Sequence, residues 1–313
     1  MIQQPAYLKK GDKIAIVCPA SKLPQSIDGA IAIFKSWGLE VETGQTVSAE
    51  HHQFAGDDAL RTQDLQHYLD DPDIKAIIAG RGGYGTIRII DELDFTAFAA
   101  NPKWIVGFSD ITVLLSHIFA SFGIQSIHAQ MPYTFDEAMP ESLESLRKAL
   151  FGEKIEYNYK AITQSKDRSP SALVANRLGQ ASGILIGGNL TLLVMVEGSQ
   201  SEMDYTDKIL FIEDVGEREV SIDRMMRMLK RSGKLAKLKG LIVGAFNEIK
   251  EEKIPFGQSP EEIIWEIVKE YDYPVCFNFP VGHIEDNRAM VVGSEVTLSI
   301  TNDGINIKSL HHK

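Results

Sequence analysis

The sequence predicts an α/β protein, because short apolar runs typical of buried strands alternate with segments in which apolar residues recur at helical spacing. Residues 11–17, 73–79 and 103–107 are such runs in the first half of the chain, and residues 208–213 and 241–245 in the second. The length of 313 residues exceeds a comfortable single core and favours two domains of ordinary size.

The composition is that of an ordinary globular protein, with 44% hydrophobic and 24% charged residues. A net charge of −11 repels phosphate backbones, so we expect no nucleic acid partner. The apolar run at residues 14–17 is too short for a signal peptide and no stretch approaches membrane-spanning length, so we expect a cytoplasmic protein with no membrane partner. Cys18 and Cys276 end separate apolar runs and are predicted to be buried, with a catalytic thiol at Cys18 as the less favoured interpretation.

The first half of the chain repeats a strand followed by a helix. Strands are predicted over residues 11–17, 39–43, 73–79, 103–107 and 125–128, and helices over 27–37, 57–69, 86–92, 111–119 and 142–150. Crossovers of this length force parallel strands with helices on both faces of the sheet. Ligands bind at the carboxyl ends of the strands in such sheets.

The pattern changes at residues 154–178, which are polar with few apolar anchors, so we place a linker there. The predicted domains are residues 1–157 and 158–313. The second half has predicted strands over residues 181–186, 208–213, 241–245 and 275–279, helices over 222–229 and 261–270, and a turn at 187–189 that opens a helix to residue 196. The tail alternates as hairpin-like strands over residues 290–292, 296–300 and 305–308.

Ser109 lies in the bend between a predicted strand and the following helix. Such a turn lifts a side chain clear of the sheet and aims the first free N–H groups of the helix at the group that the side chain attacks, which suits a nucleophile. The spacing differs from the hydrolase motif Gly-x-Ser-x-Gly, because Ile111 stands at the second glycine position. A helix cap at Ser109 or Asp110 is the structural alternative.

The segment Gly80-Arg81-Gly82-Gly83-Tyr84-Gly85 follows the third predicted strand. It matches Gly-x-Gly-x-x-Gly literally, but the dinucleotide fingerprint belongs after the first strand of its unit, so we do not favour a nucleotide site. Glycines also let bare N–H groups approach a developing oxyanion. Because this loop and Ser109 follow consecutive strands, they can flank one site, which strengthens the nucleophile hypothesis.

A serine nucleophile needs a base, and His283 on a glycine-proline loop is the best placed of the eight histidines. His117 and His128 remain alternatives. Glu213 at a strand end is a plausible carboxylate to orient the imidazole, although spacing alone does not prove that the three residues meet. His51 and His52 are adjacent but no cysteine or carboxylate cluster accompanies them, so we expect no metal site.

Five blocks together resemble the LD-carboxypeptidase family, the serine peptidases that include muramoyltetrapeptide carboxypeptidase and the microcin-C immunity peptidases. The blocks are Arg81 to Gly85, Gly107 to Thr112, Gly187 to Leu190, Ile212 to Glu217, and Gly282-His283, in the family's order along nearly the whole chain. The resemblance implies Ser109 as nucleophile, His283 as base and Glu213 as its orienting acid. Glu217 lies in the same block as Glu213 and is the alternative acid.

The resemblance also implies an oxyanion hole from the backbone N–H groups of Asp110 and of a loop glycine, for which we choose Gly83 over Gly82. It implies a flavodoxin-like parallel sheet in the N-terminal domain and a smaller, mixed α/β C-terminal domain with barrel-like character that supplies the glutamate and the histidine. Family members are commonly dimeric and need no cofactor, so we expect a homodimer with no bound cofactor.

The expected function is hydrolysis of the L,D peptide bond that releases a terminal D-amino acid, D-Ala, from murein tetrapeptides during cytoplasmic recycling of cell-wall peptides. Two alternatives remain. One is an amidase of the microcin-C immunity type, which would share the triad. The other is a nucleotide-binding protein that uses residues 80–85 without hydrolysis.

Overall fold

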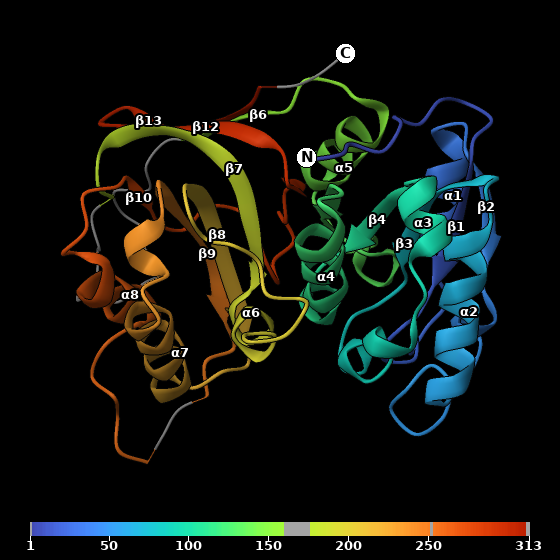
Figure 1. The fold of residues 1–313 in the computed structure, drawn as a ribbon, viewed down its shortest axis with the longest axis horizontal. Helices are drawn as coiled ribbons and strands as arrows, with labels where there is room; N and C mark the ends of the chain where they lie inside the picture. The colour runs from blue at the N-terminus through green and yellow to red at the C-terminus, as the bar shows by residue number, and fades with distance from the viewer. Residues whose placement is uncertain (1, 160–175, 251–252, 311–313) are drawn as a thin grey trace.

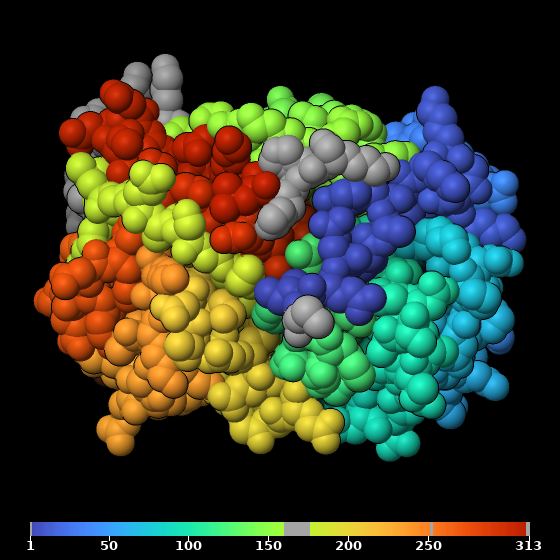
Figure 2. Space-filling view, turned by 45° about the horizontal axis from the view of Figure 1, so that its top comes forward, coloured from blue at the N-terminus to red at the C-terminus, as the bar shows by residue number. Residues whose placement is uncertain are grey.

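The computed structural model describes residues 2–159, 176–250 and 253–310. Two β-sheets lie side by side, one built mainly from the first half of the chain and the other mainly from the second half (Figure 1). The two halves form opposite sides of one continuous molecular surface (Figure 2). Within the described ranges, no helix combines the length and the apolar character needed to cross a membrane.

The first sheet has the strand order β11-β5-β4-β3-β1-β2. Its strands are β1 (Lys13–Val17), β2 (Glu40–Thr43), β3 (Ile74–Ala79), β4 (Trp104–Gly107), β5 (Ser126–His128) and β11 (Met290–Val292). Strands β1 to β5 are parallel in the order 2-1-3-4-5, which is the flavodoxin-like order, and β11 adds an antiparallel edge. The predicted flavodoxin-like sheet is therefore confirmed.

Helices cover both faces of this sheet because successive residues of a buried strand point to opposite faces. On β1, Ile14 and Ile16 pack with α1 (Asp28–Ser36) and α5 (Pro140–Phe151). Ala15 and Val17 face the other way and pack with α2 (Asp58–Asp70), α3 (Thr96–Ala100) and α4 (Thr112–Phe122).

The second sheet has the order β10-β9-β8-β7-β12-β13-β6. Its strands are β6 (Glu156–Tyr159), β7 (Gly179–Asn189), β8 (Lys208–Val215), β9 (Gly240–Asn247), β10 (Val275–Cys276), β12 (Glu295–Thr301) and β13 (Gly304–Ser309). Strands β7 to β10 are parallel and β12, β13 and β6 pair antiparallel, so the predicted mixed α/β unit is confirmed. In the described part of the chain this sheet stays open between β10 and β6, so its barrel-like character does not reach a closed barrel.

Helices α6 (Leu190–Met195), α7 (Glu219–Arg231) and α8 (Pro260–Val268) pack against the second sheet and share its hydrophobic core. Short 3₁₀-helices occupy residues Gln45–Val47, Thr86–Arg88, Ile90–Glu92, Ser109–Ile111, Pro132–Thr134 and Leu235–Lys237.

Two local predictions differ from the structure. Residues 86–92, predicted as one helix, form two 3₁₀ turns, since four of the first five residues are β-branched and disfavour an α-helix. Gly187 and Gly188, predicted as a turn, are the extended end of β7 with φ of 146° and 147°. That conformation is open to glycine alone, so the pair marks a close backbone approach rather than a reversal.

The chain crosses between the sheets in both directions. β6 precedes the second half yet pairs with β13, whereas β11, predicted as part of the tail hairpin, pairs with β5 of the first sheet. The hairpin itself is formed by β12 and β13. The predicted domain boundary at residues 157 and 158 falls inside β6, and most of the predicted linker lies outside the described residues, so the division remains a prediction.

Cutting the chain after residue 157 tests how far the halves depend on each other. The first fragment would lack β11 and the second would lack half of β6, so each sheet would lose an edge and expose strand hydrogen-bonding groups. We expect each fragment alone to melt below the full chain in circular dichroism, and co-expression to restore a stable complex in gel filtration. A fragment that melts with the full chain's midpoint would contradict this expectation.

Candidate active site

Ser109 occupies a strained elbow between β4 and α4. Its φ is 62°, in the left-handed region that residues other than glycine seldom adopt. The elbow is tight, since a methyl group on Gly107 would lie 2.7 Å from Cγ2 of Ile111. The predicted bend at Ser109 is therefore present, and its strain is typical of a residue held by its surroundings at a functional site.

The glycine loop at residues 80–85 lies directly against this elbow. A methyl group on Gly82 would lie 2.9 Å from Cβ and 3.2 Å from Oγ of Ser109, so only glycine fits there without displacing the serine. Gly83 has φ of 99°, and a methyl group on it would lie 2.2 Å from Oγ of Ser21. Ser21 in turn donates its N–H to the Gly82 carbonyl at 3.1 Å and accepts from the Tyr84 N–H at 3.2 Å.

Three backbone N–H groups near Ser109 have no acceptor in the described part of the protein. Among the described residues, no hydrogen bond within the protein is donated by the N–H of Gly82, Gly83 or Asp110. The Gly82 carbonyl points at Ser21, and in a trans peptide the following N–H, that of Gly83, points the opposite way.

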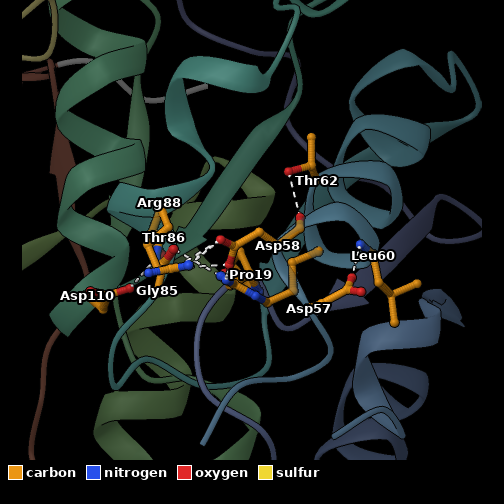
Figure 3. Close-up of polar contacts among 10 residues, drawn as sticks. Pro19, Asp57, Asp58, Leu60, Thr62, Gly85, Thr86, Arg88 and Asp110 are labelled. Carbon is orange, nitrogen blue, oxygen red and sulfur yellow. Dashed lines mark hydrogen bonds and ion pairs between the residues drawn. The ribbon is translucent and has the colours of Figure 1, made fainter. Parts of the chain in front are cut away.

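Buried charged side chains hold the glycine loop in place through hydrogen bonds to its backbone and to the adjacent residue Thr86 (Figure 3). The Asp110 carboxylate accepts from the Thr86 N–H at 2.8 Å, and burial raises the pKa of that carboxyl. Arg61 of α2, fully buried, donates to the carbonyls of Pro19 at 2.6 Å and Gly85 at 2.9 Å. The C-terminal end of the glycine loop is thereby tied to rigid elements, which limits its movement around the elbow.

Glu213 and His283 form a hydrogen-bonded pair on the second sheet. Glu213 lies on β8 with an exposed fraction of 0%, and its Oε2 is 2.8 Å from Nδ1 of His283. The pairing of β8 with β9 shifts register at this residue, an irregularity that is common beside active sites. A methyl group on Gly282, whose φ is 117°, would lie 2.8 Å from Cβ of Glu213, so the histidine loop reaches the carboxylate only through glycine.

The protonation of His283 follows from this pair. Burial lowers its pKa, but the charge of Glu213 and the hydrogen bond to Glu213 outweigh burial, and the net effect raises the pKa above its usual value. The ring of His283 packs against Phe108, with 4.9 Å between ring centroids. Phe108 directly precedes Ser109, so this contact joins the imidazole to the residue beside the elbow.

The alternative residues of the sequence analysis lie in other surroundings. Glu217 contacts Thr191, with 3.4 Å between its Oε1 and the threonine Oγ1. His117 on α4 has its Nδ1 3.0 Å from Oγ of Ser201. Within the described part of the chain, neither residue hydrogen-bonds to the Glu213–His283 pair.

His128 and Cys18 are fully buried. Burial lowers the pKa of His128 to about 4 and raises the pKa of the Cys18 thiol to about 12. A base or thiolate nucleophile at pH 7 needs a pKa nearer to neutrality and access to the substrate. The structure therefore gives no support to either residue as a reacting group.

Sequence reasoning missed two groups of supporting residues. Arg61 could have been noticed, because it stands four residues before Leu65 and seven before Tyr68 on the buried stripe of α2. Asp214 is buried beside Glu213 and accepts from the side-chain N–H of Asn189 at 2.9 Å. Burial, and after it the charge of Glu213, raises the pKa of Asp214 to about 6.

Comparison with known proteins identifies the family. Residues 14–129 match the model described as LD-carboxypeptidase N-terminal domain, and residues 182–298 match the LD-carboxypeptidase C-terminal domain. The chain belongs to the LD-carboxypeptidase family. The resemblance carried by the five sequence blocks is thereby confirmed, and the protein is a peptidase of this family.

Named relatives and solved structures agree with that assignment. The chain is 33% identical over 300 residues to the "Probable murein peptide carboxypeptidase" of Bacillus subtilis, covering 95% of this chain and 91% of that protein. It is 26% identical over 294 residues to the microcin C7 self-immunity protein MccF of Escherichia coli, covering 86% and 84%. The crystal structure of muramoyltetrapeptide carboxypeptidase from Oxalobacter formigenes has a TM-score of 0.82 at 29% identity, covering 96% of this chain and 99% of that one.

Glu213→Gln keeps the side-chain shape and removes its charge. Because that charge raises the pKa of His283, we expect the variant's acid limb of kcat/KM to move to lower pH. The maximal rate should also fall, by up to about 10⁴-fold as in the comparable Ser-His-Asp triad, because the imidazole loses its orienting acceptor. The measurement is a pH–rate profile of wild type and variant.

Glu217→Gln is the matched control, since it makes the same chemical change four residues away without touching His283. Its acid limb should stay at the wild-type pH. An unshifted limb in Glu213→Gln, or a shifted limb in Glu217→Gln alone, would contradict the role of Glu213.

Proposed function

We propose that this protein is a serine carboxypeptidase that cleaves the L,D peptide bond of murein tetrapeptides and releases the terminal D-Ala. The observation that carries the proposal is the hydrogen-bonded pair of Glu213 and His283, packed through Phe108 against the strained Ser109 elbow. The names of relatives, which refer to murein peptides and muramoyltetrapeptide, support the substrate class.

In the proposed mechanism the Oγ of Ser109 attacks the carbonyl carbon of the L,D bond while His283 takes the hydroxyl proton. The resulting oxyanion accepts hydrogen bonds from the N–H groups of Asp110 and Gly83. We prefer Gly83 to Gly82 because its N–H points away from Ser21, which binds the preceding carbonyl. Each such donor stabilises the tetrahedral intermediate by about 3 kcal/mol.

Collapse of the tetrahedral intermediate breaks the C–N bond. His283 returns its proton to the leaving nitrogen, so D-Ala departs as a neutral amine and an ester to Ser109 remains. A water molecule then attacks the ester, again losing its proton to His283, and the shortened peptide is released with Ser109 restored. Glu213 holds the imidazole in one tautomer and stabilises the imidazolium formed in each half-reaction.

A second candidate is cleavage of a microcin C-type amide, because one relative is a microcin C7 self-immunity protein. Both activities would use the same triad. They differ in the groups bound beside the scissile bond, so the substrate itself must decide. Incubation with a mixture of muropeptides, followed by mass spectrometry, should show loss of one alanine from tetrapeptides only. Intact tetrapeptides together with cleavage of an aminoacyl sulfamoyl nucleoside would favour the second candidate.

Ser109→Ala removes the nucleophile without adding bulk. We expect turnover of tetrapeptide to fall by about 10⁶-fold, the scale of loss for a triad serine in a comparable enzyme, while calorimetric binding of the peptide persists. The melting temperature should stay close to that of wild type. A variant that keeps a tenth of wild-type turnover would contradict the nucleophile assignment.

Two further measurements test whether the protein is instead a metallopeptidase or a nucleotide-binding protein. Chelators should leave wild-type turnover unchanged, and inhibition by EDTA that zinc reverses would indicate a metallopeptidase. Equilibrium dialysis against NAD, NADP and ATP addresses the glycine loop, since tight binding that persists without hydrolysis would favour a nucleotide-binding protein.

A further inference from the structure

The two halves of the site approach each other closely at Thr112 and Gly188. Thr112 is the first residue of α4, three residues after Ser109, and Gly188 is near the end of β7. A methyl group on Gly188 would lie 2.6 Å from Cγ2 of Thr112, so the helix that follows the nucleophile rests directly on the backbone of the second sheet.

A chain of hydrogen bonds starts at this contact and crosses to the strand that carries Glu213. The backbone N–H of Asn189 donates to Oγ1 of Thr112 at 3.1 Å, and the side-chain Nδ2 of Asn189 donates to Oδ1 of Asp214 at 2.9 Å. Thr112 has an exposed fraction of 0%, and Asn189 and Asp214 each have 3%. One end of the chain is three residues from Ser109 and the other is next to Glu213.

Each link in this chain is itself fixed. The second oxygen of Asp214 accepts from the N–H of Thr191 at 2.9 Å and from its hydroxyl at 2.8 Å. The Oδ1 of Asn189 accepts from the Leu192 N–H at 3.2 Å and caps α6. Because both side chains have several partners, neither can rotate without leaving buried polar groups unpaired, which is unfavourable.

We propose that Thr112, Asn189 and Asp214 are positioning residues that lock the Ser109 elbow in register with the Glu213–His283 pair. This inference rests on the proposed function. Proton transfer from serine to histidine requires heavy atoms within hydrogen-bond reach, about 2.6–3.2 Å, and the two groups belong to different sheets. Apolar packing alone would hold the sheets together, whereas directional hydrogen bonds also fix how the two sheets align.

Thr112→Val tests the first link, because it keeps the shape of the side chain and removes the oxygen that accepts from Asn189. A displacement of about 1 Å costs on the order of 10²-fold in rate, so we expect kcat for tetrapeptide to fall by about 10- to 100-fold with KM nearly unchanged. Thr112→Ser keeps the hydroxyl and should restore most of the turnover. Equal losses in both variants would show that packing, not the hydrogen bond, is responsible, and would overturn the proposal.

Ser201→Ala is the matched control. It removes another buried hydrogen bond between α4 and the second half of the chain, the contact with His117, which lies further along α4 from Ser109. We expect a lower melting temperature with kcat unchanged. If Thr112→Val lowers the melting temperature in the same way and leaves kcat intact, the three residues are merely structural and the proposal fails.

Asp214→Asn provides a second route if Thr112→Val does not fold. The substitution removes one acceptor oxygen from a side chain that serves both Asn189 and Thr191, so kcat should fall and the effect should be non-additive with Thr112→Val. Wild-type kcat in Asp214→Asn would overturn the proposal. Failure of the proposed function is separate, since it would appear as retained turnover in Ser109→Ala.

Discussion

The site depends on the hydrogen bond between His283 and the carboxylate of Glu213, which is fully buried. Burial of an isolated carboxylate costs several kcal/mol, and here one oxygen faces His283 while the other, Oε1, has no hydrogen-bond partner in the described part of the chain. The pair is therefore strongly coupled: the imidazole offsets the burial of the carboxylate, and the carboxylate raises the pKa of the imidazole. The raised pKa makes the imidazole of His283 a stronger base but leaves less of it neutral near neutral pH.

On the side of the first sheet, the site is built from a strained backbone and a close backbone approach rather than from charged groups. Ser109 holds a left-handed backbone that costs of order 1–3 kcal/mol, and Gly82 approaches it more closely than any side chain would allow. Both features persist because hydrogen bonds hold the loop against the elbow. The Asp110 carboxylate accepts from the N–H of Thr86, and Arg61 donates to the Gly85 carbonyl. The contacts that hold the loop in place thus come from the buried side chains of Asp110 and Arg61.

Local patterns in the sequence are sufficient for the strands other than β6, which lies in the predicted linker, and for the Ser109 bend. They are also sufficient for the choice of His283 and Glu213 as candidates, since apolar periodicity and strand ends are properties of neighbouring residues. Pairing between distant strands was not predictable in the same way. Strands as short as β11 carry no signal of their partner, so its place beside β5 was missed. The sequence predicts a turn at Gly187 and Gly188 because a glycine pair permits both a turn and a close backbone approach. Only the packing of Gly188 against Thr112 distinguishes the two. Glu213 lies on β8 and contacts His283, whereas Glu217 lies beyond the end of β8 and contacts Thr191. The sequence preference for Glu213 came from its position at a strand end, which is held more rigidly than a loop.

Asp214 shows what the assembly of the site costs the fold. Its pKa is raised to about 6, whereas an aspartate in an unfolded chain titrates near 3.9, so between about pH 4 and pH 6 the native state binds more protons than the unfolded state. The free energy of unfolding therefore falls as pH rises through this window, and ionised Asp214 lowers it by about 2–3 kcal/mol at neutral pH, from a shift of roughly two pKa units. A neutral residue would avoid that loss but could not accept from Asn189, Thr191 and the neighbouring backbone at once. Asp214 therefore lowers the free energy of unfolding while its hydrogen bonds align the two sheets. Such a residue is expected where alignment matters more to the protein than a few kcal/mol of stability.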